Sequence, residues 1–384
     1  MIHLFLNGSG ASAGGGLTYL RNVVPHLSAH GDVHTTVVAN PAVQRELESL
    51  PRISLVEFSD ASVAARFWQE QRRLPQLIRQ SGSQVLISAG NFALRRSPVP
   101  QILLSRNSLY TSSDFSRDLL SRHDYELWVG TKIKAMFAKR SIAWADHTVA
   151  PSLAFAAELY TWTGREIVTL HHGFDHDAFV RDSQPLPVEI QRKLQRTDNS
   201  LRLLFVSHYN YYRNFETLLR ALPILQQKLN RSVQLFLTCK LRAEENPGSY
   251  KTDKAAALVR ELGIAKNVVE LGTIPYELLH QVYRACDLYV TPAYAESFAH
   301  PLVEAMASGV PVVASDLPVH REICGDAALF FDRFSPEQLA AAIVHAISGN
   351  LPAQMTADGR ARSQAFSWKR HVDELLQLAS SLIV

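Results

Sequence analysis

The stretch DLYVTPAYAESFAHPLVEAMASGVPVVAS, residues 287–315, decides the fold class of this 384-residue chain. Two short apolar runs, residues 287–292 and 311–315, flank residues 301–308, where Pro301 suits the first turn of a helix. A strand, a helix and a second strand in this order form a βαβ unit with parallel strands. The stretch therefore predicts a parallel sheet that is covered by helices.

The same alternation continues on both sides of this stretch. Further strand-like runs lie at residues 2–7, 33–40, 53–58, 84–90, 100–106, 147–152, 166–173, 201–208, 233–239 and 267–271, with helical patterns between them. A polar segment at residues 183–202, with prolines at 185 and 187, interrupts the alternation and reads as a connector. We therefore expect an α/β protein with two doubly wound, Rossmann-like domains that face each other across a cleft.

The expected domain ranges are residues 1–185 and residues 186–366. The last helical pattern, residues 367–384, carries an apolar stripe and is expected to pack back on the first domain. In doubly wound sheets, ligands bind beyond the carboxyl ends of the strands. The residues that follow the strands are therefore the ones to search for a site.

Composition excludes several classes of protein. A net charge of +3 argues against nucleic acid as an obligatory partner. The three cysteines are far apart and odd in number, which favours a reducing cytoplasm over a disulfide framework. The N-terminal run reads as a first strand and not as a signal peptide, and no apolar stretch reaches the ~18 residues of a membrane span. Residues 128–140, basic and aromatic, could rest on the inner face of a membrane, although a solvated helix face is the preferred interpretation.

Two loops carry residues that suit a phosphate group. Three glycines, Gly14 to Gly16, lie between a strand and a helix, where the backbone can approach an anion, although a merely flexible loop is the alternative. The glycine pattern fits a dinucleotide fingerprint poorly, because no acidic residue ends the second strand. In the second loop, His208 and Arg213 follow a strand, and they could hold a phosphate or simply be solvated.

Two carboxylates, Glu296 and Glu304, bracket the loop before the helix at residues 301–308. We place Glu304 in the first turn of that helix, where it could merely stabilise the positive helix end. Glu296 lies on the preceding loop, where its oxygens could accept hydrogen bonds from the vicinal hydroxyls of a sugar. The backbone N–H groups around residues 298–302 form a further candidate anion site.

These segments together resemble the retaining glycosyltransferases of family 4, which have the two-domain GT-B fold. The resemblance is strongest over residues 206–332 and includes the spacing of the two glutamates (E-x7-E), HHGFDHDAF, SHYNYYRN and the late FSW. It implies a metal-independent hexosyltransferase of polysaccharide biosynthesis that needs no cofactor. The donor would be a UDP- or GDP-linked sugar, and the acceptor a saccharide or a lipid-linked saccharide.

The resemblance also implies roles for individual residues. Glu296 would hold the donor sugar near the reacting carbon, and Glu304 would bind the ribose. The diphosphate would be bound from one domain by Gly15 and Gly16, and from the other by the set His208, Arg213, Phe298, Ala299, His300, Pro301 and Leu302.

The sequence departs from the family pattern at several positions. His208 stands where an arginine is usual, Arg213 where a lysine is usual, and His300 where an apolar residue is usual. Asn107 stands where many relatives carry a histidine, and we treat it as a second candidate catalytic residue. The Asp175–Asp177 segment, DHD, imitates a metal motif of another fold, but a plain turn is the preferred interpretation.

Two alternatives to a transferase stay open at this point. One is a nucleotide-sugar 2-epimerase of the same architecture, and the other is a non-catalytic nucleotide-sugar-binding subunit. An oxidoreductase that uses NAD is disfavoured, because the dinucleotide fingerprint is incomplete.

Overall fold

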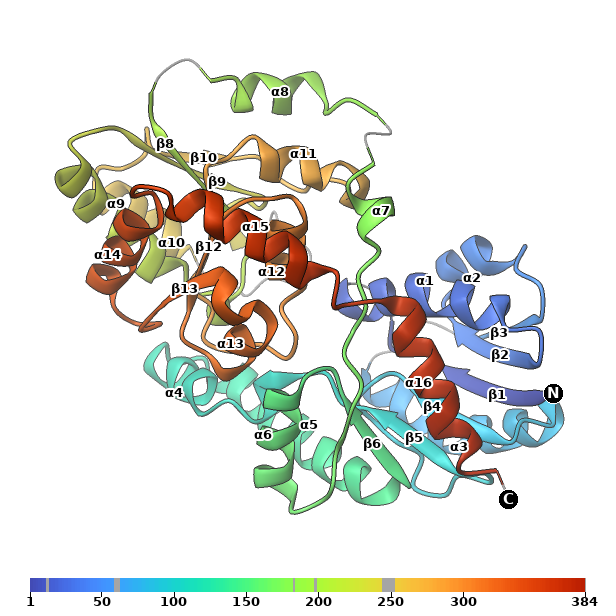
Figure 1. Cartoon of the computed structure of the whole chain (residues 1–384). Helices are drawn as coiled ribbons and strands as arrows, with labels where there is room; N and C mark the ends of the chain where they lie inside the picture. Colours follow the sequence, from blue (N-terminus) through green and yellow to red (C-terminus); the bar gives the residue numbers. More distant parts are fainter. Residues whose placement is uncertain (12–13, 59–62, 182–183, 197–198, 244–252, 384) are drawn as a thin grey trace. The chain divides into compact units, whose positions relative to one another are not determined.

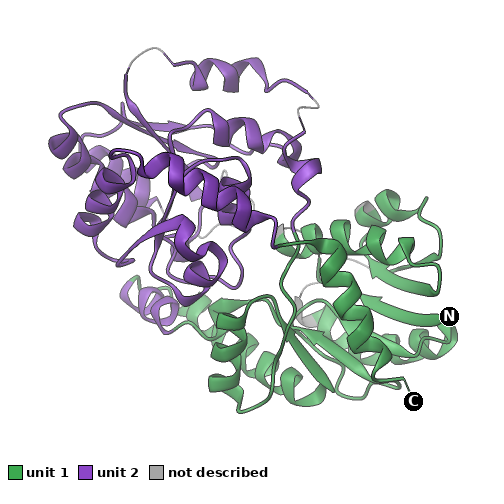
Figure 2. Cartoon of the chain, in the orientation of Figure 1, with its two compact units in different colours: residues 1–112, 122–173, 366–384 green, residues 113–121, 174–365 purple. Residues whose placement is uncertain are grey.

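In the computed structural model, which describes residues 1–11, 14–58, 63–181, 184–196, 199–243 and 253–383, the chain forms two compact units. Unit 1 comprises residues 1–112, 122–173 and 366–384, and unit 2 comprises residues 113–121 and 174–365 (Figure 2). Each unit contains one parallel sheet. The prediction of two doubly wound α/β domains is confirmed.

Unit 1 is built on a sheet of seven strands in the order β3-β2-β1-β4-β5-β6-β7 (Figure 1). The strands are β1 (Ile2–Asn7), β2 (Val33–Ala39), β3 (Ile53–Glu57), β4 (Val85–Ser88), β5 (Gln101–Leu104), β6 (His147–Ala150) and β7 (Val168–Thr169). The helices are α1 (Gly14–Ala29), α2 (Pro41–Leu47), α3 (Val63–Ser81), η1 (Ser108–Tyr110), α5 (Tyr125–Trp144), α6 (Leu153–Thr163) and α16 (Trp368–Ser380). Strands β4 and β5 are buried at every position, as expected where helices cover both faces of a parallel sheet.

Unit 2 is built on a sheet of six strands in the order β10-β9-β8-β11-β12-β13 (Figure 1). The strands are β8 (Leu201–Phe205), β9 (Val233–Leu237), β10 (Val268–Glu270), β11 (Leu288–Thr291), β12 (Val312–Ser315) and β13 (Ala328–Phe331). The helices are α4 (Ser113–Ser121), α7 (His176–Phe179), α8 (Val188–Leu194), η2 (Tyr211–Arg213), α9 (Phe215–Leu229), α10 (Lys254–Glu261), η4 (Tyr276–Leu278), α11 (Leu279–Arg284), α12 (His300–Ala307), α13 (Pro318–Cys324), η5 (Gly325–Ala327), α14 (Pro336–Ala346) and α15 (Leu351–Ser363). The core of this unit lies where α9 and α14 pack against strands β8, β9 and β11.

The strand orders place a topological switch point in each unit. In unit 1 the chain crosses outward in opposite directions from β1 and β4, and in unit 2 from β8 and β11. The loops after such neighbouring strands diverge and leave a crevice at the carboxyl edge of the sheet. The first place to look for a ligand site in unit 2 is therefore the pair of loops after β8 and β11.

The structure differs from the expected organisation in two segments. The expected connector contains helix α8, because Leu186, Ile190 and Leu194 recur on one face and are buried in unit 2. Helix α4, which we expected in the first domain, belongs to unit 2. Its Asp114 pairs with Arg333 at 2.7 Å, and its Asp118 accepts a hydrogen bond of 2.6 Å from the Tyr294 hydroxyl.

The C-terminal helix α16 packs in unit 1, where Trp368, Val372 and Leu375 join the core formed by β1 and α1. The chain can pass close to Gly173 at the start of α16 only because residue 173 is a glycine. A β-carbon there would lie 2.0 Å from the backbone nitrogen of Trp368. Only glycine allows the two backbone segments to come this close.

Candidate functional site

Arg213 and Glu296 form an ion pair at the switch point of unit 2. Arg213 ends η2, on the loop after β8, and Glu296 lies on the loop after β11. Arg213 Nη1 donates to Glu296 Oε2 at 2.6 Å, and the two side chains are only 16% and 14% exposed. Two segments 83 residues apart in the sequence are therefore joined by a largely buried pair of charges.

The pair sets the protonation state of both groups. Burial raises the pKa of Glu296, but the Arg213 guanidinium and the backbone N–H of Ser297 outweigh it, and the pKa ends below its usual value. Burial lowers the pKa of Arg213, but the groups around it, Tyr212 and Glu296 foremost, raise it above its usual range. Glu296 is therefore a carboxylate at neutral pH, held in one orientation.

Arg213 has a hydrogen-bond donor that the ion pair does not use. Its Nε is buried and has no hydrogen-bond partner within the described part of the chain. A buried donor without an acceptor is costly, and an anionic ligand would remove that cost. The guanidinium can thus hold Glu296 and bind a second anion together.

Asn214 fixes the loop that presents Arg213. Its backbone adopts the left-handed conformation, with φ of 55°, which asparagine tolerates better than most residues. Its side-chain amide donates to the carbonyl of Pro292 at 3.1 Å and to that of Arg333 at 2.5 Å. Asn214 therefore ties the loop after β8 to the loops after β11 and β13.

The helix that follows Glu296 begins earlier than the sequence predicts. Ala299 takes a left-handed conformation, with φ of 67°, and α12 starts at His300. Glu304 consequently lies in the second turn and not the first, so our placement of Glu304 was wrong. The interpretation of Glu304 as a mere helix-end charge is weakened, because that effect fades beyond the first turn.

The proposed cluster of amides at residues 298–302 is smaller than expected. The Leu302 amide donates to the Ala299 carbonyl at 3.0 Å, and Pro301 has no N–H. The cluster can include at most the amides of Phe298, Ala299 and His300. The His300 ring lies against the Phe298 ring, with 4.8 Å between centroids.

Glu304 is buried beside Tyr283 of α11. The Tyr283 hydroxyl donates to Glu304 Oε2 at 2.9 Å, and only 5% of Glu304 is exposed. Burial raises the pKa of Glu304 to about 7, although the bond from Tyr283 opposes the shift. Glu304 therefore changes its charge near neutral pH.

We expect Glu304→Gln to remove part of the pH dependence of stability. The folded-state pKa lies above the unfolded value, so the folded state binds the extra proton and loses stability as pH rises toward 7 and beyond. Between pH 5 and pH 8 the wild type should lose about 2 kcal/mol of unfolding free energy relative to Glu304→Gln.

Calorimetry at several pH values measures this difference. It is preferable to fluorescence because all five tryptophans lie in unit 1. The exposed Glu261→Gln in α10 is the matched control. Parallel curves for the wild type and Glu304→Gln would contradict a raised pKa at this position.

Two histidines flank the ion pair. Loss of hydration and the charge of Arg213 lower the pKa of His208, which favours the neutral ring at neutral pH. His320 of α13 is fully buried, and its Nδ1 lies 2.9 Å from the Ser315 carbonyl. Burial lowers the pKa of His320 against the opposing effects of that bond and of the nearby Glu296 charge.

The predicted site residues of unit 1 lie at the carboxyl edge of its own sheet. Gly15 and Gly16 belong to the first turn of α1 and not to a loop before it. The half-buried Arg106 guanidinium donates to the carbonyl of Gly15 at 3.3 Å and to that of Ala89, and it lies over the Tyr19 ring. Arg106 therefore positions the glycine turn.

Asn107 stabilises the start of the short helix η1. Its side-chain oxygen accepts a hydrogen bond of 3.1 Å from the Leu109 amide and caps η1. The departure from the family pattern at this position thus has a local explanation. Its catalytic role stays a prediction.

His171, His172 and the DHD segment make contacts within the fold. The His171 carbonyl lies 2.9 Å from His371 Nδ1, and the His172 ring packs against Tyr19 and Trp368. Asp175 caps α7 by accepting from the Ala178 amide at 3.1 Å. No group of three or more potential metal ligands occurs among the described residues.

Three residues of this site were not identified from the sequence, namely Tyr283, His320 and Asn214. Asn214 matters because its side chain links three loops. An asparagine directly before a helix is a usable signal for a left-handed residue. Tyr283 and His320 have none, because α11 and α13 meet α12 only in the folded sheet.

Two family models match most of the chain. The model described as Glycosyltransferase Family 4 matches residues 13–178, and that described as Glycosyl transferases group 1 matches residues 188–362. The chain is 36% identical over 215 residues to the O-antigen chain mannosyltransferase B of Escherichia coli, covering 55% of this chain and 53% of that protein. It is 29% identical over 247 residues to a D-inositol 3-phosphate glycosyltransferase of Geodermatophilus obscurus, covering 61% and 52%. The matched part thus spans about half the length of these relatives.

Solved structures share the fold over the whole chain. Sucrose-phosphate synthase from Thermosynechococcus elongatus superimposes with a TM-score of 0.76 at 18% identity, covering 100% of this chain and 99% of that one. HepE from Anabaena, solved in complex with UDP, gives 0.71 at 18% identity and covers both chains fully. At this level of identity the likeness establishes the fold, which is GT-B.

Proposed function

Because the chain belongs to the family 4 glycosyltransferases, we propose that it transfers a hexose-type sugar from a nucleoside diphosphate sugar to a saccharide or lipid-linked acceptor, with retention of configuration. The observation that carries the proposal is the buried Arg213–Glu296 pair at the switch point of unit 2, with Arg213 Nε left unpartnered. The relatives named for mannosyl and inositol-phosphate glycosyl transfer support the reaction class. HepE, solved with UDP-glucose, supports the class of donor.

Sugar transfer requires the site to stabilise the leaving diphosphate and to orient the donor sugar. As the bond between the anomeric carbon and the diphosphate breaks, negative charge grows on the leaving diphosphate, and the acceptor hydroxyl attacks the carbon from the same face and passes its proton to the departing diphosphate oxygen. Arg213 would stabilise that charge through the N–H groups that Glu296 leaves unused. Glu296, fixed as a carboxylate, would accept hydrogen bonds from the sugar hydroxyls and orient the ring.

Glu304 would bind the ribose of the nucleotide. A carboxylate can accept two hydrogen bonds from the vicinal ribose hydroxyls, and Tyr283 already holds one of its oxygens in place. Removing a charged acceptor from such a contact costs about 1.5–3 kcal/mol, or roughly 10–100-fold in affinity. Unchanged nucleotide affinity in Glu304→Ala would count against the ribose assignment.

The function is tested with a panel of nucleotides and nucleotide sugars. UDP or GDP should raise the melting temperature, and incubation with the matching UDP- or GDP-hexose and an acceptor should release the nucleoside diphosphate. EDTA should leave the rate unchanged. A shift with NAD alone would reject the proposal, and an epimerised sugar still attached to its nucleotide would identify the epimerase instead.

We further propose that α5 contacts an anionic membrane surface. Tyr125, Val129, Ile133 and Met136 recur at helical spacing and are each 44–55% exposed, an apolar stripe on one face. Lys132, Lys134 and Arg140 of the same helix are also exposed and would complement anionic headgroups. Among the described residues, no helix is long and apolar enough to cross a membrane.

Vesicle sedimentation separates this contact from its alternatives. The protein should bind vesicles of phosphatidylglycerol and phosphatidylcholine more tightly than pure phosphatidylcholine, and Ile133→Ser with Met136→Ser should weaken binding several-fold. Equal binding to neutral vesicles, or a dimer that the same substitutions dissociate, would reject the membrane proposal. The second result would assign the stripe to a copy of this chain.

A further inference from the structure

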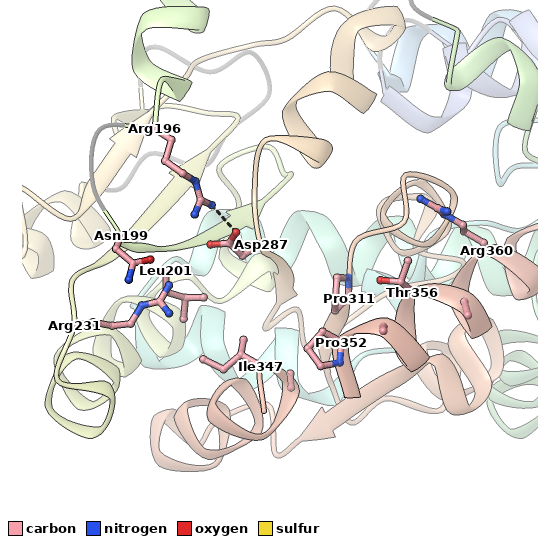
Figure 3. Close-up of a pocket in the computed structure, with 13 residues that line it drawn as sticks. Arg196, Asn199, Leu201, Arg231, Asp287, Pro311, Ile347, Pro352, Thr356 and Arg360 are labelled. Carbon is pink, nitrogen blue, oxygen red and sulfur yellow. Dashed lines mark hydrogen bonds and ion pairs between the residues drawn. The ribbon is translucent and has the colours of Figure 1, made fainter. Parts of the chain in front are cut away.

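A pocket of about 740 Å³ lies at the amino edge of the sheet of unit 2 (Figure 3). Its walls come from the segment between α8 and β8, from residues that precede or begin β8, β9, β11 and β12, and from α14 and α15 with the turn between them. Those that the argument uses are Arg196, Asn199, Arg231, Asp287, Pro311 and Arg360. Because all strands of the sheet are parallel, this edge is opposite to the one that carries Arg213 and Glu296.

The lining has an excess of positive charge. Among the described residues that line the pocket there are three arginines and one acid, Asp287. That carboxylate is already bound on both oxygens, by Arg196 at 2.5 Å and by the backbone N–H of Arg202 at 2.9 Å. It holds the Arg196 guanidinium in place, and the remaining N–H groups of that guanidinium are still available to an anion.

Arg231 adds a donor that lacks an acceptor. Its Nε is buried and has no hydrogen-bond partner in the described part of the structure. Figure 3 shows its side chain by Leu201 and Asn199, at the same end of the pocket as the Arg196–Asp287 pair. Arginines that present several fixed N–H groups match the oxygens of a phosphate.

Most of the remaining lining is apolar, with Asn199 and Thr356 as its polar members. Leu201, Pro311, Ile347 and Pro352 line the space between the Arg196–Arg231 end and Arg360 (Figure 3). The Arg360 guanidinium lies against the backbone of Gly309, where a β-carbon would meet its Nη2 at 2.4 Å. The volume is within the range of small-molecule sites. A ligand of this pocket would therefore combine an anionic group with a compact body that covers aliphatic surface.

We propose that this pocket binds a small organic phosphate monoester, with the phosphate between Arg196 and Arg231. The site is separate from the proposed donor site, because the length of a strand, ~15 Å for five residues, lies between the two edges of the sheet. The proposal does not depend on the proposed function, since it uses none of the residues assigned to sugar transfer.

Isothermal titration calorimetry on the full chain tests the proposal with AMP, glucose 6-phosphate and inorganic phosphate as probes. At least one of the two monoesters should bind with a Kd below about 1 mM and more tightly than inorganic phosphate, which lacks a body. Arg231→Gln should raise that Kd about tenfold or more, as should Arg196→Gln. Arg220→Gln in α9, an exposed arginine outside the pocket, is the matched control and should leave it unchanged.

Hydrogen exchange locates the bound probe. Protection by the monoester should appear at residues 285–289 and 351–360 and be lost in Arg231→Gln. The proposal is overturned if no monoester binds at millimolar concentration, or if Arg231→Gln binds it as tightly as Arg220→Gln. The donor-site proposal would survive either result, because it is judged by UDP and GDP alone.

Discussion

Replacing Glu296 by glutamine is expected to lower kcat for sugar transfer by about 10²–10³-fold, while the affinity for the nucleoside diphosphate changes little. The substitution keeps the shape of the side chain and an oxygen that can accept from Arg213, but it removes the negative charge that would orient the sugar hydroxyls. Loss of one preorganised group at a reacting centre has roughly this cost. An alanine would be a poorer test, because it would leave the buried Arg213 without its partner.

Initial rates and nucleotide titrations on the same preparations separate the two effects. Glu261→Gln, the same chemical change at an exposed position, should retain wild-type kcat. A Glu296→Gln enzyme within threefold of the wild type would exclude Glu296 from the transfer step. Loss of nucleotide binding together with kcat would instead place Glu296 against the nucleotide.

The sequence was sufficient for the fold because the relevant patterns are local. Apolar runs such as residues 288–290 are continuous, as expected for strands covered on both faces, and Pro301 marks the first turn of a helix. The short helix α8 was not predicted because two prolines precede it, Pro185 and Pro187, and prolines are typical of segments between helices and strands. Only two side chains of α8, Ile190 and Leu194, are buried, and together with Leu186 just before the helix they are too few to stand out from a polar segment.

The candidate site was predictable by residue but not by geometry. Arg213 and Glu296 could each be named from their loops, yet nothing local says that they pair, because the order β8-β11 that brings them together is a property of the sheet. The same holds for Tyr283, whose contact with Glu304 depends on how α11 packs beside α12. The first turn of α12 was misplaced because a left-handed alanine is rare, and no sequence rule anticipates Ala299.

Replacing Arg213 by methionine is expected to lower the unfolding free energy of unit 2 by about 3–5 kcal/mol. Methionine fills much of the volume, so the main loss is the charge that balances Glu296. Removing one partner of a buried pair leaves an uncompensated charge, which has about this cost. The double variant Arg213→Met with Glu296→Gln removes both charges and should recover at least half of the loss.

The destabilisation caused by Arg213→Met should depend on pH in a definite direction. In the wild type the guanidinium holds the pKa of Glu296 below its usual value, whereas in Arg213→Met the effect of burial raises it. A raised folded-state pKa means that the folded variant binds a proton and gains stability as pH falls. The destabilisation in Arg213→Met should therefore be smaller at pH 5 than at pH 8, and the double variant should lose this dependence. Calorimetry of both variants decides the point, because a double variant no more stable than Arg213→Met at pH 8 would show that packing, and not the unpaired carboxylate, causes the loss.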